Sequence, residues 1–319
     1  MEGLPKTPQK EESLGSETIR EIESIQKGRD LSVLSVKELN SIKEKYIKLK
    51  EELGISNQEG LQTSYEQAEV IMGESFYGSE EITSTLGFEF PKDRIPPIPY
   101  SPEFLEKAKE LGELLMLRVE DNGSGVPMTM SHIKTIMESR MDKDEEGKLF
   151  YDQNWYKEEP FFKESSLKTE WRLVSKEFVP DTTSKNYIQQ TRLLRDYLLG
   201  LESLSEEEKE ECTDDLLNEL QDMLDKDPDG NWKEVAKKLS DLSINKNHRR
   251  IPVEVIYDWV LQFKKTKGRG ILERNYDWTG TLSSGGRLVS LGRADVHGVS
   301  VGDDGPGHRG GTLGVVSLR

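Results

Sequence analysis

The segment from Thr279 to Arg319 contains no Lys, Glu, Gln, Met or Trp, although these residues are common in the rest of the chain. Lys, Glu, Gln and Met are strong helix formers, so their absence argues against a helix here. Glycine and valine are frequent instead, and they favour turns and strands. This feature predicts that the chain ends in β structure.

Apolar and small residues alternate within this segment. Val299 and Val301 alternate with Ser300 and Gly302, and Leu313–Val316 forms a last apolar run. Residues 302–312 are rich in Gly and Asp, which predicts an exposed loop. Because successive side chains of a strand point to opposite faces, one set is expected to face the core and the other to face outward.

The genetic code offers a reason for the missing residue types. A codon with random first and second bases and a pyrimidine in third place cannot encode Lys, Glu, Gln, Met or Trp, yet it encodes every type found in this segment. A fixed framework combined with such randomised codons would have this composition. A glycine-rich β segment is the alternative. It accounts for the missing Lys and Glu, but less well for the missing Trp and Gln, and it predicts fewer arginines.

The order of short motifs in this region resembles the C-terminus of variable proteins of diversity-generating retroelements. The motifs are Tyr276-x-Trp278-Thr279, Ser284-Gly285-Gly286, Val289-x-Leu291-Gly292, Gly298-Val299-x-Val301 and Leu313-Gly314-Val315. Upstream segments are also similar: Ile71-Met72-Gly73, Phe150-Tyr151-x-Gln153-x-Trp155-Tyr156, Trp171-x-Leu173-Val174 and Thr183-Ser184-Lys185-Asn186. The resemblance covers roughly residues 64–200 and 251–319.

This resemblance implies an α+β protein with a C-type-lectin-like fold that needs neither disulfides nor calcium. It also implies a binding function, in which a reverse transcriptase rewrites exposed positions while the framework stays fixed. By matching the pattern, the residues expected to vary and to contact a ligand are Asp277, Gly280, Leu282, Arg287, Ser290, Arg293, Asp295, His297, Ser300, Gly302, Asp303, Asp304, Gly305, Pro306, Gly307, His308, Gly310, Gly311 and Thr312. The ligand is expected to be a protein or another macromolecule.

The rest of the chain divides by composition. Residues 1–15 are polar and are expected to be disordered, and residues 16–60 are expected to form a helical segment. A lectin-like domain is expected over 64–319, with an acidic helical insertion at 201–245 and the variable region at 275–319. The apolar stripe within 35–54 can pack on the body of the protein or pair with a second copy in a short coiled coil.

Local signals predict several elements of the domain. Tyr65–Met72 is expected to be helical, Ser101-Pro102 is a typical helix start, and Pro252 begins another helix. Strands are expected at Leu114–Val119 and Trp171–Val174, and Ser184 is the expected cap of a helix that ends at Gly200. The insertion reads as two amphipathic helices joined at Asp225–Gly230.

Charge and cysteine content limit the class of protein. The chain has a net charge of −16, which argues against a nucleic-acid partner. Its single cysteine, Cys212, cannot form an intrachain disulfide or a cysteine-based zinc cluster. The sequence shows neither a signal peptide nor a membrane segment, so we expect a soluble, cytoplasmic protein.

Motifs for catalysis or metal binding are incomplete. Asp121-Asn122-Gly123-Ser124-Gly125 resembles the DxGxG motif of an ATP-binding fold, but the other parts of that fold are missing. The acidic stretches that start at Asp142 and Asp225 begin like EF-hand loops, but each lacks the Glu at the twelfth position. We therefore expect no catalytic residue, metal or cofactor. The alternatives are an enzyme on a lectin-like or ATP-binding fold and a structural oligomer assembled through the N-terminal helices.

Overall fold

The computed structural model describes residues 62–142 and 145–319, and Thr63–Arg319 forms one compact unit. The expectations for residues 1–60, including the helical stripe at 35–54, lie outside the described residues. The helices are α3 (Tyr65–Met72), α4 (Ser79–Leu86), α5 (Pro102–Glu110), α6 (Met130–Glu138), α7 (Pro160–Lys163), α8 (Tyr187–Gly200), α9 (Glu206–Glu211), α10 (Asp214–Lys226), α11 (Trp232–Asp241), α12 (Ser243–His248) and α13 (Pro252–Thr266). The strands are β1 (Phe76–Tyr77), β2 (Glu113–Arg118), β3 (Glu170–Ser175), β4 (Tyr276–Leu282), β5 (Leu288–Asp295), β6 (Gly298–Asp304) and β7 (Leu313–Gly314).

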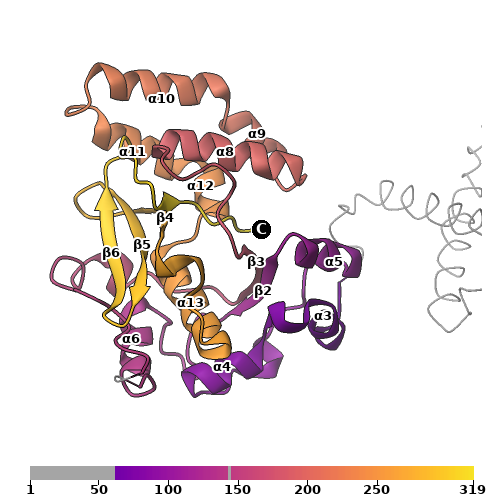
Figure 1. The fold of residues 1–319 in the computed structure, drawn as a ribbon. Helices are drawn as coiled ribbons and strands as arrows, with labels where there is room; N and C mark the ends of the chain where they lie inside the picture. The colour runs from indigo at the N-terminus through magenta and orange to yellow at the C-terminus, as the bar shows by residue number, and fades with distance from the viewer. Residues whose placement is uncertain (1–61, 143–144) are drawn as a thin grey trace, which may run out of the picture. The chain divides into compact units, whose positions relative to one another are not determined.

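These elements form an α+β unit with two sheets (Figure 1). The smaller sheet has the order β1-β2-β3, with β1 parallel and β3 antiparallel to β2. The C-terminal sheet has the order β6-β5-β4-β7, in which β4, β5 and β6 form antiparallel hairpins and β7 lies parallel to β4. After β7 the chain crosses to the smaller sheet, where Leu173 and Arg319 exchange two backbone hydrogen bonds of 2.9 and 3.0 Å.

Most of the local signals give the expected elements. Ser101 caps α5 through Phe104 N–H at 3.2 Å, with Pro102 at the first helical position. The expected strands at 114–119 and 171–174 are β2 and β3, and the expected pair of amphipathic helices corresponds to α10 and α11. The cap of α8 was expected at Ser184, which is wrong. Asn186 is the cap, because it accepts from Gln189 N–H and forms a reciprocal capping box. Ser184 has φ of 61°.

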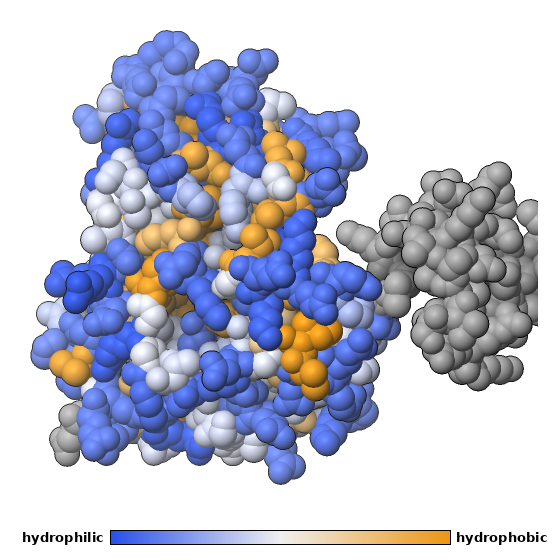
Figure 2. Space-filling view, turned by 45° about the vertical axis from the view of Figure 1, so that its right-hand side comes forward, coloured by the Kyte–Doolittle hydropathy of each residue, from blue (hydrophilic) through white to orange (hydrophobic). Residues whose placement is uncertain are grey.

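Two hydrophobic clusters lie on opposite sides of the C-terminal sheet. One cluster fills the body around α13 and includes Val289, Leu291, Val299 and Val301. The other lies under α8, α10, α11 and α12 and includes Trp278 and Leu288. The acidic segment 201–245 is therefore part of the packing of the C-terminal sheet. In Figure 2 the residues of this helical layer are mostly hydrophilic on the visible face, and apolar residues gather where the layer meets the rest of the unit.

No helix within the described ranges 62–142 and 145–319 combines the length and the apolar character that a membrane span requires.

Candidate binding surface

The residues expected to vary do not all face solvent. Exposed ones are Arg287, Arg293, His297, Gly307, His308, Gly311 and Thr312. Half-buried ones are Gly280, Leu282, Asp295, Ser300, Gly302, Asp303, Asp304, Gly305 and Gly310, and buried ones are Asp277, Ser290 and Pro306. The expectation of an outward set is thus wrong for the buried three, because both faces of the sheet near β4 and β5 are covered by hydrophobic clusters.

Asp277 is an anchor inside the protein and not a surface residue. Its carboxylate accepts from Arg250 Nε at 2.9 Å and from Val316 N–H at 2.9 Å. Arg250 also contacts Asp258, which is fully buried with Arg118. The network joins β2, α13 and β4. A buried carboxylate in such a chain cannot be replaced freely, because its loss leaves a buried cation without its partner.

Ser290 and Pro306 are buried for different reasons. Ser290 pairs with Trp278 on one side and Gly302 on the other, within the face of the sheet that carries the second cluster. The carbonyl of Pro306 accepts the N–H of Tyr187 at 3.0 Å, which fixes the loop against the start of α8. Both residues hold the surface in place without forming it.

Glycines of the sheet fall into two groups that differ in the space around them. A Cβ at Gly292, Gly298 or Gly314 would lie within 1.9, 2.3 or 2.5 Å of Asn275, Phe150 or Phe178, respectively. These three belong to the framework motifs. At Gly305 a Cβ would meet nothing within 4 Å, and at Gly302 and Gly311 its nearest neighbours would lie at 3.3 and 3.8 Å.

The same contrast holds for the backbone. Framework residues Gly286 and Gly298 have φ of 84° and 111°, which L-residues rarely adopt. The glycines expected to vary are absent from the positive-φ set. Gly280 is the clear exception in space, because its Cβ would lie 2.6 Å from the carbonyl oxygen of Asn245, and the nearest Cβ contacts at Gly310 and Gly307 are also tight, at 3.1 and 3.2 Å. Arg293 is the exception in backbone conformation, because it is expected to vary but has a positive φ of 46°.

A cavity of about 440 Å³ opens where one end of the C-terminal sheet meets α10 and α11. We call this end, formed by residues 282–288 and 302–312, the helix-side end. Arg287, Asp304, Gly305, Gly307 and His308 line the cavity from the sheet. Gln221, Leu224, Asp225, Pro228, Asp229 and Trp232 line it from the helices, together with Asn186 and Arg309. Residues expected to vary thus share one cavity with residues of the acidic segment.

Charges in this cavity are only partly compensated. The Arg287 guanidinium carbon lies 5.2 Å from the centre of the Trp232 ring, a cation–π contact. His308 Nδ1 lies 3.8 Å from an Asp304 carboxylate oxygen. Burial raises the pKa of Asp304; His308 lowers it and neighbouring Asp303 raises it. The cavity can therefore receive a ligand that brings its own charges or hydrogen-bond donors.

The opposite end of the sheet is the tip of the β5–β6 hairpin, residues 293–299. Tyr151, exposed by 62%, lies beside it with its ring 6.4 Å from that of His297. Trp155, exposed by 40%, lies further along β6, where its Nε1 donates to the carbonyl of Val301 at 3.2 Å. Backbone contacts dominate here: Val299 N–H donates to Leu149 at 2.8 Å, and Tyr151 N–H donates to Val299 at 3.1 Å. Arg293, Asp295 and His297 are the residues expected to vary at this end.

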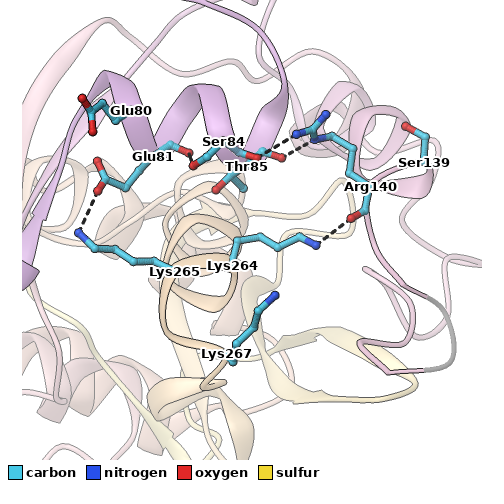
Figure 3. A pocket seen from close by; sticks show the side chains of 9 residues that line it. All are labelled: Glu80, Glu81, Ser84, Thr85, Ser139, Arg140, Lys264, Lys265 and Lys267. Carbon is cyan, nitrogen blue, oxygen red and sulfur yellow. Dashed lines mark hydrogen bonds and ion pairs between the residues drawn. The ribbon is translucent and has the colours of Figure 1, made fainter.

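A larger cavity of about 570 Å³ lies away from the C-terminal sheet, between α4 and the end of α13 (Figure 3). Its cations are already engaged. Arg140 donates to the carbonyls of Thr85 and Ser84 at 2.7 and 2.9 Å, and Lys265 pairs with Glu81 at 2.9 Å. Lys264 and Lys267 both pair with Glu146. These contacts hold α4, the segment that follows α6, and α13 together. The charged residues that line this cavity therefore have a structural role.

The sequence motifs that suggested nucleotide or calcium binding form turns. Asp121 pairs with Arg94 at 2.6 Å and accepts from Gly123 N–H at 2.7 Å, and it bridges to Pro127. Asp227 accepts from Gly230 N–H at 3.0 Å in the turn between α10 and α11. Within residues 62–142 and 145–319, no three His, Cys, Asp or Glu side chains are grouped as metal ligands are.

Sequence reasoning missed the contribution of the acidic segment to this cavity. Asp225, Asp229 and Trp232 lie about fifty or more residues before the loop they face, and no local pattern links the two. The available signal was Trp232 itself, a large aromatic residue directly after an acidic turn.

Comparisons with models of protein families, with curated proteins and with solved structures gave no match for this chain.

Proposed function

We propose that this chain is a ligand-binding protein whose contacts come from exposed C-terminal residues at the helix-side end of the sheet, and that a diversity-generating retroelement rewrites those residues. A C-type-lectin-like fold is part of the same proposal. The described α+β architecture, with the C-terminal hairpins packed on the body, is consistent with it.

The observation that carries the proposal is the division between the two groups of glycines. Three glycines that the resemblance treats as framework have no room for a Cβ: Gly292, Gly298 and Gly314. Gly305 and Gly311, which it treats as variable, have room and do not have a positive φ. Gly302, also treated as variable, has no positive φ either, but a Cβ there would lie 3.3 Å from Ser290 Oγ, so that side chain would have to shift slightly. A surface that must accept many side chains without unfolding needs this division.

The geometry also narrows the proposed contact residues. Asp277, Ser290, Pro306 and Gly280 are removed from the set, because burial or lack of space fixes them. Of the remaining positions, Arg287, Asp304, Gly305, Gly307 and His308 line the cavity, and Gly302, Asp303 and Gly311 belong to the same end of the sheet. Gly307 is the tightest of these, since its Cβ would lie 3.2 Å from Leu224.

Deep sequencing of the 3′ end of this gene across its source population tests the proposal, together with a search of the flanking DNA for a near-copy. Variants should accumulate at Arg287, Gly302, Asp304, Gly305 and His308, and the near-copy should carry adenines at those codons. Gly292, Gly298 and Gly314 should stay invariant. An invariant 3′ end without a near-copy would refute retroelement diversification.

A further inference from the structure

The cavity at the helix-side end has one wall that the proposed diversification leaves unchanged. That wall consists of Leu224, Asp225, Asp229 and Trp232, from the end of α10 and the start of α11. Its turn is held by hydrogen bonds of its own: Asn231 Nδ2 donates to the carbonyl of Met223 at 2.8 Å, and Asn231 N–H donates to that of Asp227 at 3.0 Å. The fixed wall therefore keeps one chemistry whatever the opposite wall becomes.

Acidic residues dominate the segment that supplies this wall. Residues 201–245 contain 15 Asp and Glu against 5 Lys and Arg, a net charge of −10 out of −16 for the whole chain. Asp225 and Asp229 place two of these carboxylates on the cavity. Asp225 accepts one hydrogen bond from Gln221 at 2.8 Å, and Asp229 forms no ion pair with any described residue. Such a surface attracts and orients a cationic partner.

The Trp232 ring already shows which group this wall accepts. Arg287 Cζ and Lys233 Nζ lie 5.2 and 5.3 Å from its centre. Among the described residues, no carboxylate lies within ion-pair distance of the Arg287 guanidinium, which acts on the Asp304 carboxylate only at longer range, so the ring is its direct contact. Arg287 comes from the wall proposed to vary. In this copy it occupies the place on the ring that a guanidinium from a ligand would take.

We infer that the wall formed by Asp225, Asp229 and Trp232 selects protein ligands that present a basic peptide segment, with Arg or Lys as the residue bound there. The cation lies on the Trp232 ring and its donors reach the two carboxylates. The opposite wall then decides which basic segment is bound. This inference rests on the proposed function, since it assigns the ligand class of the same site.

A display library of the full chain tests this, randomised at Arg287, Gly302, Asp304, Gly305 and His308. The library is built on three backgrounds: native, Asp225→Asn with Asp229→Asn, and Glu219→Gln with Asp222→Asn. The third makes the same change in charge at exposed residues of α10 that do not line the cavity. Each library is selected on three immobilised twelve-residue peptides that differ only in carrying four Arg, four Gln or four Glu.

Binders to the arginine peptide should come from the native and control backgrounds, with affinities at least about tenfold better than from the Asp225→Asn, Asp229→Asn background. Among them, Arg at position 287 should be depleted at least threefold relative to the unselected library, because it competes for the ring. Equal recovery on all three peptides and all backgrounds would overturn the inference and leave the proposed function standing. A failure to obtain any binder to the arginine peptide would overturn the inference alone, because sequencing of the 3′ end decides the proposed function.

Discussion

The two ends of the C-terminal sheet are built from the same strands but are held in different ways. At the hairpin tip, backbone meets backbone: a Cβ at Gly147 would lie 2.1 Å from the carbonyl oxygen of Val296, and Val299 N–H donates to Leu149. At the helix-side end, side chains of two separate segments face each other across a cavity of about 440 Å³. Backbone contacts restrict which residues fit, whereas a side-chain-lined cavity does not.

This difference shows where sequence variation is tolerated. The tip has exposed aromatic side chains, but its backbone is fixed and Arg293 has φ of 46°, where Gly, Asn and Asp are favoured. The helix-side end has open positions at Gly305 and Gly311, and at Gly302 a Cβ would meet only the side-chain oxygen of Ser290, at 3.3 Å. We therefore expect variation to be broad at the helix-side end and narrow at the tip.

The largest effect is expected from Gly298→Ala at the tip. The new Cβ would lie 2.3 Å from the carbonyl carbon of Phe150, and φ of 111° is unfavourable for alanine. Overpacking and backbone strain together should cost about 4 kcal/mol. Urea unfolding followed by circular dichroism measures the loss. A loss below about 1 kcal/mol would mean that the tip is no more restricted than the opposite end.

The next effect concerns the middle of the sheet, which both ends share. Asp277→Ala should cost about 3 kcal/mol, because Arg250 is left buried with only its longer contact to Asp258. Asp229→Ala is the matched control, since that exposed side chain has no ion pair among the described residues; it should change the free energy of unfolding by less than about 0.5 kcal/mol. Similar losses in both variants would contradict the anchoring role of Asp277.

Acid should weaken the segment that packs against the tip, since Glu146 lies two residues before Lys148, whose N–H donates to the carbonyl of Val296. Burial opposes ionisation of this carboxyl group, but hydrogen bonds from Lys264 and Lys267 outweigh it and lower its pKa to about 2. Because the folded pKa lies below that of the unfolded chain, its stabilisation is complete above about pH 4.5 and is lost as the pH falls towards 2. The native chain should lose about 2 kcal/mol more than Glu146→Gln over that range. Parallel pH profiles of the unfolding free energy would disprove this.

At the helix-side end, ionisation of a carboxyl group should lower the free energy of unfolding, whereas ionisation of Glu146 raises it. Burial raises the pKa of Asp304, so ionising this carboxyl group is less favourable in the folded protein than in the unfolded chain. Asp304→Asn should therefore increase the free energy of unfolding at pH 7, by about 0.5 kcal/mol after allowance for partial exposure. The gain should vanish when both proteins are measured at a pH below 3. A loss of stability at pH 7 would show that the His308 contact dominates.

The smallest effect is expected at Gly305. Since a Cβ there meets nothing within 4 Å and φ is ordinary, Gly305→Ala should change the unfolding free energy by less than about 0.5 kcal/mol. Urea unfolding of Gly305→Ala and Gly298→Ala under the same conditions compares the two ends of the sheet directly. Destabilisation by more than about 1.5 kcal/mol would remove the physical basis for variation at the helix-side end.

Local sequence signals predicted much of the fold and less of the surface. Ser101-Pro102 and Pro252 gave the starts of α5 and α13, and apolar runs gave β2 and β3, because these patterns depend on neighbouring residues alone. The cap of α8 was misplaced by two residues, since Ser184 and Asn186 are both good caps in isolation.

The missed features depend on contacts between distant segments. Ser290 was expected to face outward, but a small polar residue on a strand gives the same pattern whether solvent or a second hydrophobic cluster covers its face. Asp277 pairs with a residue 27 positions away, and Trp232 meets Arg287 only after α11 has packed on the sheet. Neither contact leaves a periodic signal in the sequence.

The loop at 305–312 is held at both ends before any ligand arrives. Tyr187 N–H donates to Pro306 at 3.0 Å, Ser184 N–H donates to Gly310 at 2.9 Å, and His308 N–H donates to Gly305 at 3.0 Å. The conformational entropy lost in ordering this loop is therefore lost on folding, and ligand binding does not have to include that cost. A single exchanged side chain can then show most of its contact energy as affinity, even on a surface with few large residues.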